Sequence, residues 1–316
     1  MFTTGNTDHL IRSKLWSDQL KEAFEDECFA NKYVDWIGFA EGDTMLIPSI
    51  GQAEVLDYDE GQSVRYTRMD TGSFPFSITS YKSSATYITQ KMKQDSYYAD
   101  RLIASFVPKM NRALQKAMEV EILAIGPNGQ TAADYNNING VPHRWVGSGT
   151  SQKIGVQDFI NARYSLQKAL VPMTNLIAIV DPSVEAELNA LSNIVNVSNN
   201  PRWEGIIRDG ISTGMKFTAN IYGFDVYVSN NLKNGITETV GSKSVSSGSG
   251  VANLFFSAAG DALPFIGAIR QAPKVDSDWN KDEQRDEYVV TTRYGMKLYR
   301  PENMCVCLTA AAAPTF

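Results

Sequence analysis

An oxygen-rich segment near the carboxyl end of the chain comes closest to a binding motif in this sequence. Its side-chain oxygens stand at positions 1, 3, 5 and 12 of the spacing of a calcium-binding loop, at Asp276, Asp278, Asn280 and Glu287. Position 6 is Lys281, where such a loop needs glycine, and the flanks at 266–270 and 288–292 resemble strands instead of helices. The pattern predicts a solvated charged loop, with a calcium site as the alternative hypothesis.

Other groups that could do chemistry are few and scattered. Cys305 and Cys307 would face the same side of a strand, but a zinc site needs two further ligands, and the sequence has no second pair. The two histidines, His9 and His143, accompany no nucleophile motif, so a surface or internally hydrogen-bonded histidine is expected. The glycines at 147–149 match neither a dinucleotide-binding nor a phosphate-binding loop. The sequence therefore predicts no enzyme and no cofactor.

The composition predicts a soluble protein with a substantial core. The 316 residues, 43% of them hydrophobic, suggest about two domains. No apolar run approaches the roughly 20 residues of a membrane span, and the start of the chain lacks a basic signal sequence. Three cysteines form no disulfide framework, which indicates a reducing compartment. A net charge of −6 disfavours binding to nucleic acid.

A long β-hairpin is the most informative element that the sequence predicts. Residues 44–50 and 52–56 are β-prone, 57–61 have turn chemistry, and 63–68 alternate as a returning strand. An isolated hairpin is marginally stable in water, so its apolar side chains are expected to lie on another copy of the chain. The expected subunit contacts are Val55, Asp57, Tyr58, Asp59, Glu60, Val64, Arg65, Tyr66 and Arg68 in the hairpin, with Leu15 and Trp16 in an amphipathic helix at 8–30.

A long amphipathic helix is expected behind the hairpin, at 96–124, because apolar residues recur there at helical spacing. Pro108 should kink it near Ala104. Further helices are expected at 156–170 and from Asp181–Pro182 to about 191, after a buried strand at 176–180.

The remaining pattern predicts mainly strands and turns. Gly223 should be the turn between two strands in 216–229, with Tyr222 and Phe224 on one face and Ile221 and Asp225 on the other. The other expected segments are a turn at 136–140, a flexible Ser/Gly loop at 242–250, a strand at 253–256, paired strands at 288–292 and 296–299 around a turn at 293–295, and a last strand at 304–308.

This order of elements resembles the major capsid protein of tailed bacteriophages. The resemblance rests on the segments 42–50, 221–230 and 294–302 in their order and spacing, and it covers nearly the whole chain. It implies an α+β, HK-ninety-seven-type fold: an N-terminal arm, an extended hairpin loop, a peripheral domain with a long spine helix, and an axial domain with a mixed sheet and flanking helices. The implied ranges are 1–33 for the arm, 44–83 for the loop, 34–43, 84–136 and 264–300 for the peripheral domain, and 137–263 and 301–316 for the axial domain.

The resemblance also implies a function. The chain would assemble with itself into hexamers and pentamers of an icosahedral shell, enclosing double-stranded DNA without sequence-specific binding and without a membrane. It would be made in the bacterial host cytoplasm and reside in the virion capsid, with a separate scaffold and a portal as partners and a decoration protein left open. Some members join subunits through a lysine on the loop, but this loop has no lysine before Lys82 at its base, so cross-linking is not expected.

Two alternatives stay open at this stage. An encapsulin-like compartment shell would resemble the same fold and enclose a protein instead of DNA. A more distant alternative is a calcium-dependent binding module or an acidic hydrolase that uses residues 276–287.

Overall fold

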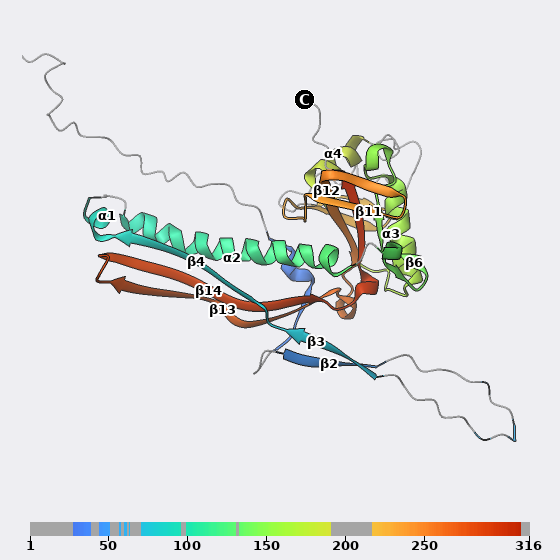
Figure 1. Ribbon diagram of the computed structural model, residues 1–316, viewed down its shortest axis with the longest axis horizontal. Coiled ribbons are helices and arrows are strands. Elements are labelled where there is room, and N and C mark those ends of the chain that lie inside the picture. The colour runs from blue at the N-terminus through green and yellow to red at the C-terminus, as the bar shows by residue number, and fades with distance from the viewer. Residues whose placement is uncertain are drawn as a thin grey trace, which may run out of the picture.

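The molecule is extended, with a long sheet-and-helix layer at one end and a second, rounder sheet at the other (Figure 1). The computed structural model describes residues 28–38, 44–50, 57, 60–61, 63, 71–95, 99–130, 133–190 and 217–310. Its mixture of helices and strands confirms the expected α+β class. No helix within these ranges is long and apolar enough to cross a membrane.

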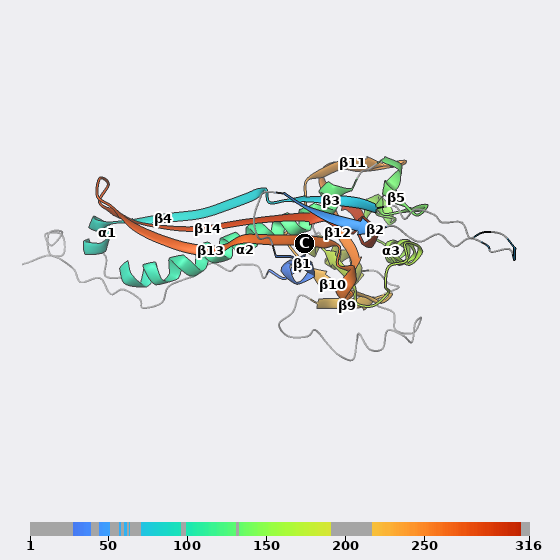
Figure 2. The same ribbon diagram turned by 90° about the horizontal axis from the view of Figure 1, so that it is seen from below.

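Four strands form the elongated layer, in the order β1, β13, β14, β4. β13 and β14 are a long antiparallel pair, and β4 pairs antiparallel with β14 along its whole length. The long helix α2 runs along one face of this sheet, and the short helix α1 lies at its far end (Figure 1 and, seen from below, Figure 2). The bounds are β1 Val34–Trp36, β4 Ser80–Thr89, α1 Gln90–Asp95, α2 Ala99–Gly129, β13 Phe265–Asn280 and β14 Arg285–Leu298.

Helix α2 packs on the sheet through one apolar side. Met110 and Leu114 are four residues apart, so they share a face of the helix, and they form a buried cluster with Val290 of β14. Helical structure continues through Pro108, and the bend expected from this proline stays a prediction. The helix ends at Gly129, later than the sequence pattern indicated.

A two-stranded hairpin projects beside the elongated sheet (Figure 1). It pairs β2, Thr44–Ile50, antiparallel with β3, Thr71–Ser77. The predicted strands at 52–56 and 63–68 lie outside the described residues, apart from Ser63. β4 begins at Ser80, so residues 80–83, expected in the loop, pair with β14.

The second sheet has seven strands. The path is β7, β15, β12, β8, β10, β9, with β11 paired to β12, and parallel and antiparallel pairs both occur, as expected for a mixed sheet. Its bounds are β7 Arg144–Val146, β8 Leu176–Val180, β9 Phe217–Ile221, β10 Phe224–Val228, β11 Ile236–Val240, β12 Lys243–Ser257 and β15 Cys305–Ala310, with helices α3 Val156–Lys168 and α4 Pro182–Ala190. Short elements are β5 Asn137–Ile138, β6 Val141–Pro142 and 3₁₀ turns at Ala30–Tyr33, Ala133–Asn136, Thr150–Gln152, Gly260–Ala262 and Pro301–Asn303.

Both faces of this sheet are covered, which explains why its central strand is apolar throughout. In β8, Ile177 and Ile179 point to a core that includes Ile122 of α2. The alternate residues Leu176 and Ala178 point to a second core, which includes side chains of α3 and α4. The end of α2 is therefore packed against one face of the seven-stranded sheet, while α3 and α4 cover the other.

Two local predictions are confirmed, one for a strand and the helix after it and one for a turn. The strand at 176–180 and the helix after it are present, and the Asp181 carboxylate accepts bonds from the Ser183 amide and hydroxyl, as a helix cap does. Gly223 is the predicted turn, with φ of +89°, and Tyr222 before it also has positive φ.

Three local predictions were wrong. The Ser/Gly segment at 242–250 is not a loop: most of it belongs to β12, which pairs with β11 and, further along, with β8 and β15. Residues 293–295 are not a turn, and 288–292 does not pair with 296–299, because β14 runs from Arg285 to Leu298 as a single strand paired with β13. Ile221 and Phe224 are cross-strand partners in one core, since a two-residue turn places its flanking residues on the same face.

Candidate assembly surfaces

The base of the β2–β3 hairpin is mounted on the subunit's own elongated sheet. Phe76 of β3 is fully buried in a cluster with Ile266 of β13. Lys297 of β14 donates a hydrogen bond to the Pro75 carbonyl oxygen at 3.0 Å and lies 4.7 Å from the centroid of the Phe74 ring. Burial, a hydrogen bond and a cation–π contact thus fix the direction in which the hairpin leaves the subunit.

The chain leaving the hairpin crosses β14 at a glycine. A Cβ atom on Gly295 would lie 2.6 Å from the Ser77 carbonyl oxygen and 2.8 Å from the Ile78 Cα. Any larger residue here would push the crossing backbone away from the sheet.

The far side of the hairpin faces outward. Leu46 of β2 is 64% exposed, and Asp57 and Glu60, which the sequence proposed as contacts, are exposed as well. The other proposed contact residues lie outside the described residues: Leu15, Trp16, Val55, Tyr58, Asp59, Val64, Arg65, Tyr66 and Arg68.

Helix α2 covers one face of the elongated sheet, and the opposite face carries exposed tyrosines in β4. Tyr81 and Tyr87 of β4 are 64% and 57% exposed, whereas Ile88, the next residue along, is buried. The Arg285 guanidinium lies 4.5 Å from the centroid of the Tyr87 ring and donates a 2.7 Å bond to Glu287. Exposed tyrosines offer large apolar area with a polar tip, which suits contacts with another protein.

The calcium-loop geometry is not formed. Asp276, Asp278 and Asn280 belong to β13, which is paired residue by residue with β14, so they do not curl around a centre. Glu287 accepts bonds from Asn280 and Arg285. No cluster of three or more histidine, cysteine, aspartate or glutamate side chains suits a metal in the part of the chain that the structure describes. The segment is the charged end of a β-hairpin, not the predicted loop.

A polar cluster joins α2 to the sheet beneath it. Glu121 of α2 makes a 2.7 Å ion pair with Lys82 and accepts a 3.1 Å bond from the Ser80 hydroxyl, both on β4. Burial raises the pKa of Tyr294 on β14 well above its usual value, and Glu121 beside it acts in the same direction. The cluster fixes the position of the helix along the strands.

A second carboxylate on α2 holds the segment that precedes β1. Glu119 is buried and accepts the backbone amide hydrogens of Phe29 and Ala30, at 3.3 Å and 2.9 Å. The chain coming from the N-terminal region is thereby fastened to α2 just before it enters the elongated sheet.

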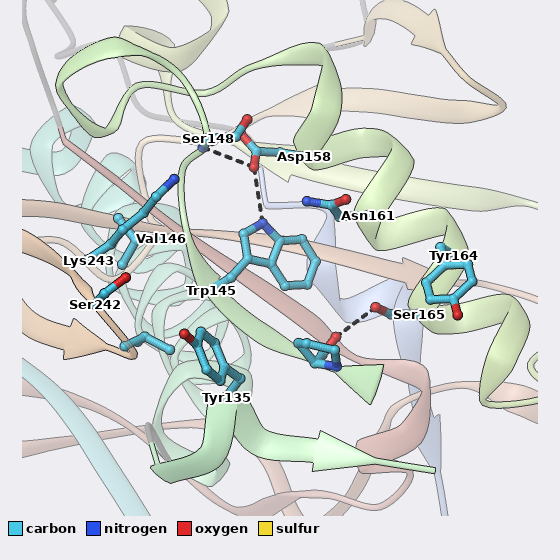
Figure 3. A pocket seen from close by; sticks show the side chains of 12 residues that line it. Tyr135, Trp145, Val146, Ser148, Asp158, Asn161, Tyr164, Ser165, Ser242 and Lys243 are labelled. Carbon is cyan, nitrogen blue, oxygen red and sulfur yellow. Dashed lines mark hydrogen bonds between the residues drawn. The ribbon is translucent and has the colours of Figure 1, made fainter. Parts of the chain in front are cut away.

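A pocket of about 400 Å³ lies at one edge of the seven-stranded sheet (Figure 3). Trp145 of β7 forms its floor, and Tyr135, Tyr164 and Lys243 stand around it (Figure 3). Tyr164 of α3 is 58% exposed, so the mouth is aromatic and open. Its polar lining includes one fully buried carboxylate, that of Asp158.

Asp158 has a structural role in this pocket. It accepts hydrogen bonds from the Trp145 indole at 3.2 Å and the Ser148 amide at 3.0 Å (Figure 3), and from the Gly155 amide at 2.8 Å. Burial raises the pKa of Asp158, and these hydrogen bonds oppose the shift. Because its oxygens are occupied by the loop before α3 and by Trp145, Asp158 fixes that loop.

The remaining candidates for chemistry are buried in the core. His143 is fully buried, with Nδ1 at 3.0 Å from the Val141 carbonyl oxygen, and burial lowers its pKa. Cys305 and Cys307 face the same side of β15, as predicted, and burial raises the pKa of both thiols. A neutral imidazole and two protonated thiols in an apolar core are suited to packing, not to catalysis.

These surfaces and the fold define a class of protein. The buried polar groups described above serve structural contacts, while several large exposed side chains, among them Leu46, Tyr81 and Tyr87, lie on a projecting hairpin and an open sheet face. This is the arrangement of a structural subunit that associates with other chains.

The comparisons with known proteins agree with this class. A family model for phage capsid protein matches residues 73–306, so the chain belongs to the phage capsid protein family. It is a capsid shell protein of the virion and not an enzyme. No curated protein matches the sequence.

Solved capsid structures share the fold. The capsid of cyanophage P-SCSP1u is 15% identical with a TM-score of 0.73, covering 99% of this chain and 96% of the other. The cyanophage Pam1 capsid is 12% identical with a TM-score of 0.69, covering 99% of each chain. A solved structure from Mycobacterium phage Che8 is 17% identical with a TM-score of 0.67, covering 95% of this chain and 97% of the other.

Sequence reasoning missed the groups that hold the parts of the subunit together. Glu119 had a weak signal, because it interrupts the apolar side of a helix between Met118 and Ile122. Arg144 and Glu238, an ion pair between strands, had none, because they are far apart in the sequence.

Proposed function

We propose that this chain is the major capsid protein of a tailed bacteriophage and assembles into hexamers and pentamers of an icosahedral shell around packaged double-stranded DNA. The observation that carries the proposal is the hairpin. Its base is locked into the subunit by Phe76 and Lys297, while it projects beyond the subunit's own core (Figure 1). A hairpin that is mounted rigidly at its base and exposes Leu46 on its outer side is suited to contact a neighbour.

Closed rings of identical chains need a donor surface and a different receiving surface on every copy. The hairpin residues 53–68 supply the donor in this proposal. The face of the elongated sheet opposite α2, where Tyr81 and Tyr87 are exposed, supplies the receiver. The net charge of −6 suits a container wall to which tightly packed DNA should not adhere.

The finer assignments belong to the same proposal. The ranges 34–43, 84–136 and 264–300 act as the peripheral domain, 137–263 and 301–316 as the axial domain, and 1–33 as the arm. The chain is made in the bacterial cytoplasm and works with a separate scaffold and a portal.

Electron microscopy of the purified full-length protein tests the assembly. Hollow particles of uniform size are expected, and a solution of monomers under all assembly conditions would contradict the proposal. The content of particles isolated from the producing cells tests the cargo. Nuclease-protected double-stranded DNA supports the capsid, and a protein cargo without DNA would favour an encapsulin-like compartment.

A further inference from the structure

Strand β4 forms one outer edge of the elongated sheet (Figure 2). All ten of its residues pair with β14 without a shift in register, and within the described ranges no strand pairs with its other side. A free edge presents a row of backbone N–H and C=O groups that another strand can bind, so proteins protect such edges with proline, bulges or charges. The residues along the two edges of this sheet therefore indicate which edge is kept from pairing.

The opposite edge of the sheet, on β13, is protected. β1 pairs with β13 only at residues 265–267. Beyond them β13 contains Pro273, which cannot donate to a ladder, and its register against β14 shifts twice. The charged residues Lys274, Asp276 and Asp278 follow along the same stretch. Proline, irregular register and charge together oppose the addition of a further strand.

The edge on β4 has none of these protections. Residues 80–89 contain no proline, and their single charged residue, Lys82, is paired with Glu121 of α2. The exposed side chains alternate with less exposed ones and are those of Tyr81, Ser83, Ala85 and Tyr87. A regular, β-prone and nearly uncharged edge is suited to accept another strand.

The sequence of β4 also matches a second copy of itself. When two β4 strands run antiparallel about a twofold axis through Ser84, each residue lies opposite the one equally far from 84 on the other side. The opposed pairs are Ser80 with Ile88, Tyr81 with Tyr87, Lys82 with Thr86, Ser83 with Ala85, and Ser84 with itself. The exposed face thus carries a tyrosine pair at each end and small residues between, and the single lysine meets threonine instead of a like charge.

We propose that the outer edge of β4 pairs antiparallel with β4 of a second copy, in the register centred on Ser84, and joins the two four-stranded sheets into one continuous sheet. The inference rests on the proposed function only in taking another capsid subunit as the partner. It uses the edge of the sheet, so the face that carries the tyrosines stays available to a neighbour's hairpin. A twofold contact closes at two copies, unlike the head-to-tail contacts of a ring, so it links subunits of different rings.

Disulfide trapping of the full-length protein, before and after assembly, tests the pairing in a Cys28→Ser background. Ser84→Cys places a thiol on the twofold axis, and the double variant Ser83→Cys with Ala85→Cys places thiols in the adjacent pairs. Opposed residues alternate between hydrogen-bonded and closer, non-hydrogen-bonded pairs, so one of the two variants has the closer geometry. The matched control is Ser277→Cys, an exposed serine on the protected strand β13. We expect a disulfide-linked dimer from at least one β4 variant and none above background from the control.

Charges at positions 83 and 85 test the register. The cross-strand neighbours of these positions on β14 are Thr291 and Val289, which are uncharged. Added to Ser84→Cys, the pair Ser83→Glu with Ala85→Glu opposes like charges twice, whereas Ser83→Lys with Ala85→Glu opposes unlike charges twice. The like-charge variant should form the dimer disulfide roughly twofold to thirtyfold more slowly, the effect of two cross-strand charge pairs. Lysine at both positions should also be slow, which separates pairing from net charge, and equal rates for all three variants would overturn the proposal.

Electron microscopy of the same samples separates failure of this inference from failure of shell assembly. Shells without a β4 disulfide would overturn the pairing and leave the capsid proposal standing, whereas a β4-linked dimer without shells would do the reverse. A disulfide between β4 and a different protein in isolated particles would overturn the pairing in favour of a strand from that protein. Circular dichroism confirms that each variant is folded.

Discussion

Arg144 and Glu238 form an ion pair with two parallel hydrogen bonds, Nε to Oε1 at 2.7 Å and Nη2 to Oε2 at 2.5 Å. The third guanidinium nitrogen, Nη1, donates to the Pro127 carbonyl oxygen at 3.1 Å. One buried side chain on β7 thus joins the last turn of α2 to strand β11. The long helix and the seven-stranded sheet are coupled at this point by charge as well as by the apolar core.

Replacing Arg144→Met should lower the free energy of unfolding by roughly 2–4 kcal/mol, because it leaves the Glu238 carboxylate and the end of α2 without their partner. The lower end of that range reflects the partial exposure of Glu238. Denaturant unfolding followed by circular dichroism measures the loss. The double variant Arg144→Met with Glu238→Met should regain part of it, and an unchanged midpoint for the single variant would contradict a role for this pair.

Gly295→Ala should displace the hairpin base, because its Cβ would lie 2.6 Å from the Ser77 carbonyl oxygen. We expect a loss of about 1–3 kcal/mol, the usual cost of overpacking, with weakened assembly. The matched control is Gly260→Ala, where a Cβ would meet nothing within 4 Å. Equal melting temperatures for the two variants would show that the crossing backbone adapts freely.

Gly223→Val should reduce the yield of soluble subunit before it affects assembly. Gly223 has φ of +89°, which a β-branched residue resists at a cost of about 1–3 kcal/mol. Gly38→Val serves as the control, since no positive φ and no close neighbour are found there. A normal yield and melting temperature for Gly223→Val would mean that the turn tolerates rearrangement.

Stability should depend on pH through His143. Burial holds its pKa below the ordinary 6.5, so the unfolded chain takes up a proton below that pH while the folded chain stays neutral. The free energy of unfolding should therefore fall as the pH drops below 6.5 and level off above it.

The measurement compares denaturant unfolding of the wild type and His143→Gln between about pH 5 and about pH 7.5. The variant should have the shallower slope. Burial raises the pKa of Asp158, so at more acidic pH the folded state binds a proton there before the unfolded state does. Protonation of Asp158 therefore increases the free energy of unfolding, whereas protonation of His143 decreases it. Identical slopes for the two proteins would exclude the buried histidine as the source.

Replacing residues 53–68 by a short Gly/Ser turn should leave a folded subunit but abolish shells. The reason is that the hairpin base, with Phe76 in the core, is retained, while the segment proposed to reach a neighbour is lost. Circular dichroism, size-exclusion chromatography and electron microscopy report fold and assembly separately. An unfolded variant would place residues 53–68 in the subunit's own core, and intact shells would make them dispensable.

The sequence alone determined the elements whose signals are local. An uninterrupted apolar run predicted the strand 176–180, and the Asp181–Pro182 pair predicted the helix that follows, because cap and turn chemistry act within a few residues. The same holds for the turn at Gly223, where positive φ selects glycine. The capsid-type fold was implied by the resemblance of the sequence to a known family.

Only the tertiary structure decided how far the strands run and what the polar residues do. The Ser/Gly segment 242–250 has the composition of a loop, yet residues from Lys243 onward belong to a strand because β11 supplies its hydrogen-bond partners. Asp276 and Asp278 have the spacing of a calcium loop, yet pairing with β14 keeps them extended. Glu119 and Arg144 acquire their roles only when residues about 90 positions away are brought beside them, as the separations to Ala30 and Glu238 show. Backbone pairing and buried charge are set by neighbours in space, and these contacts between distant residues leave no local signal in the sequence.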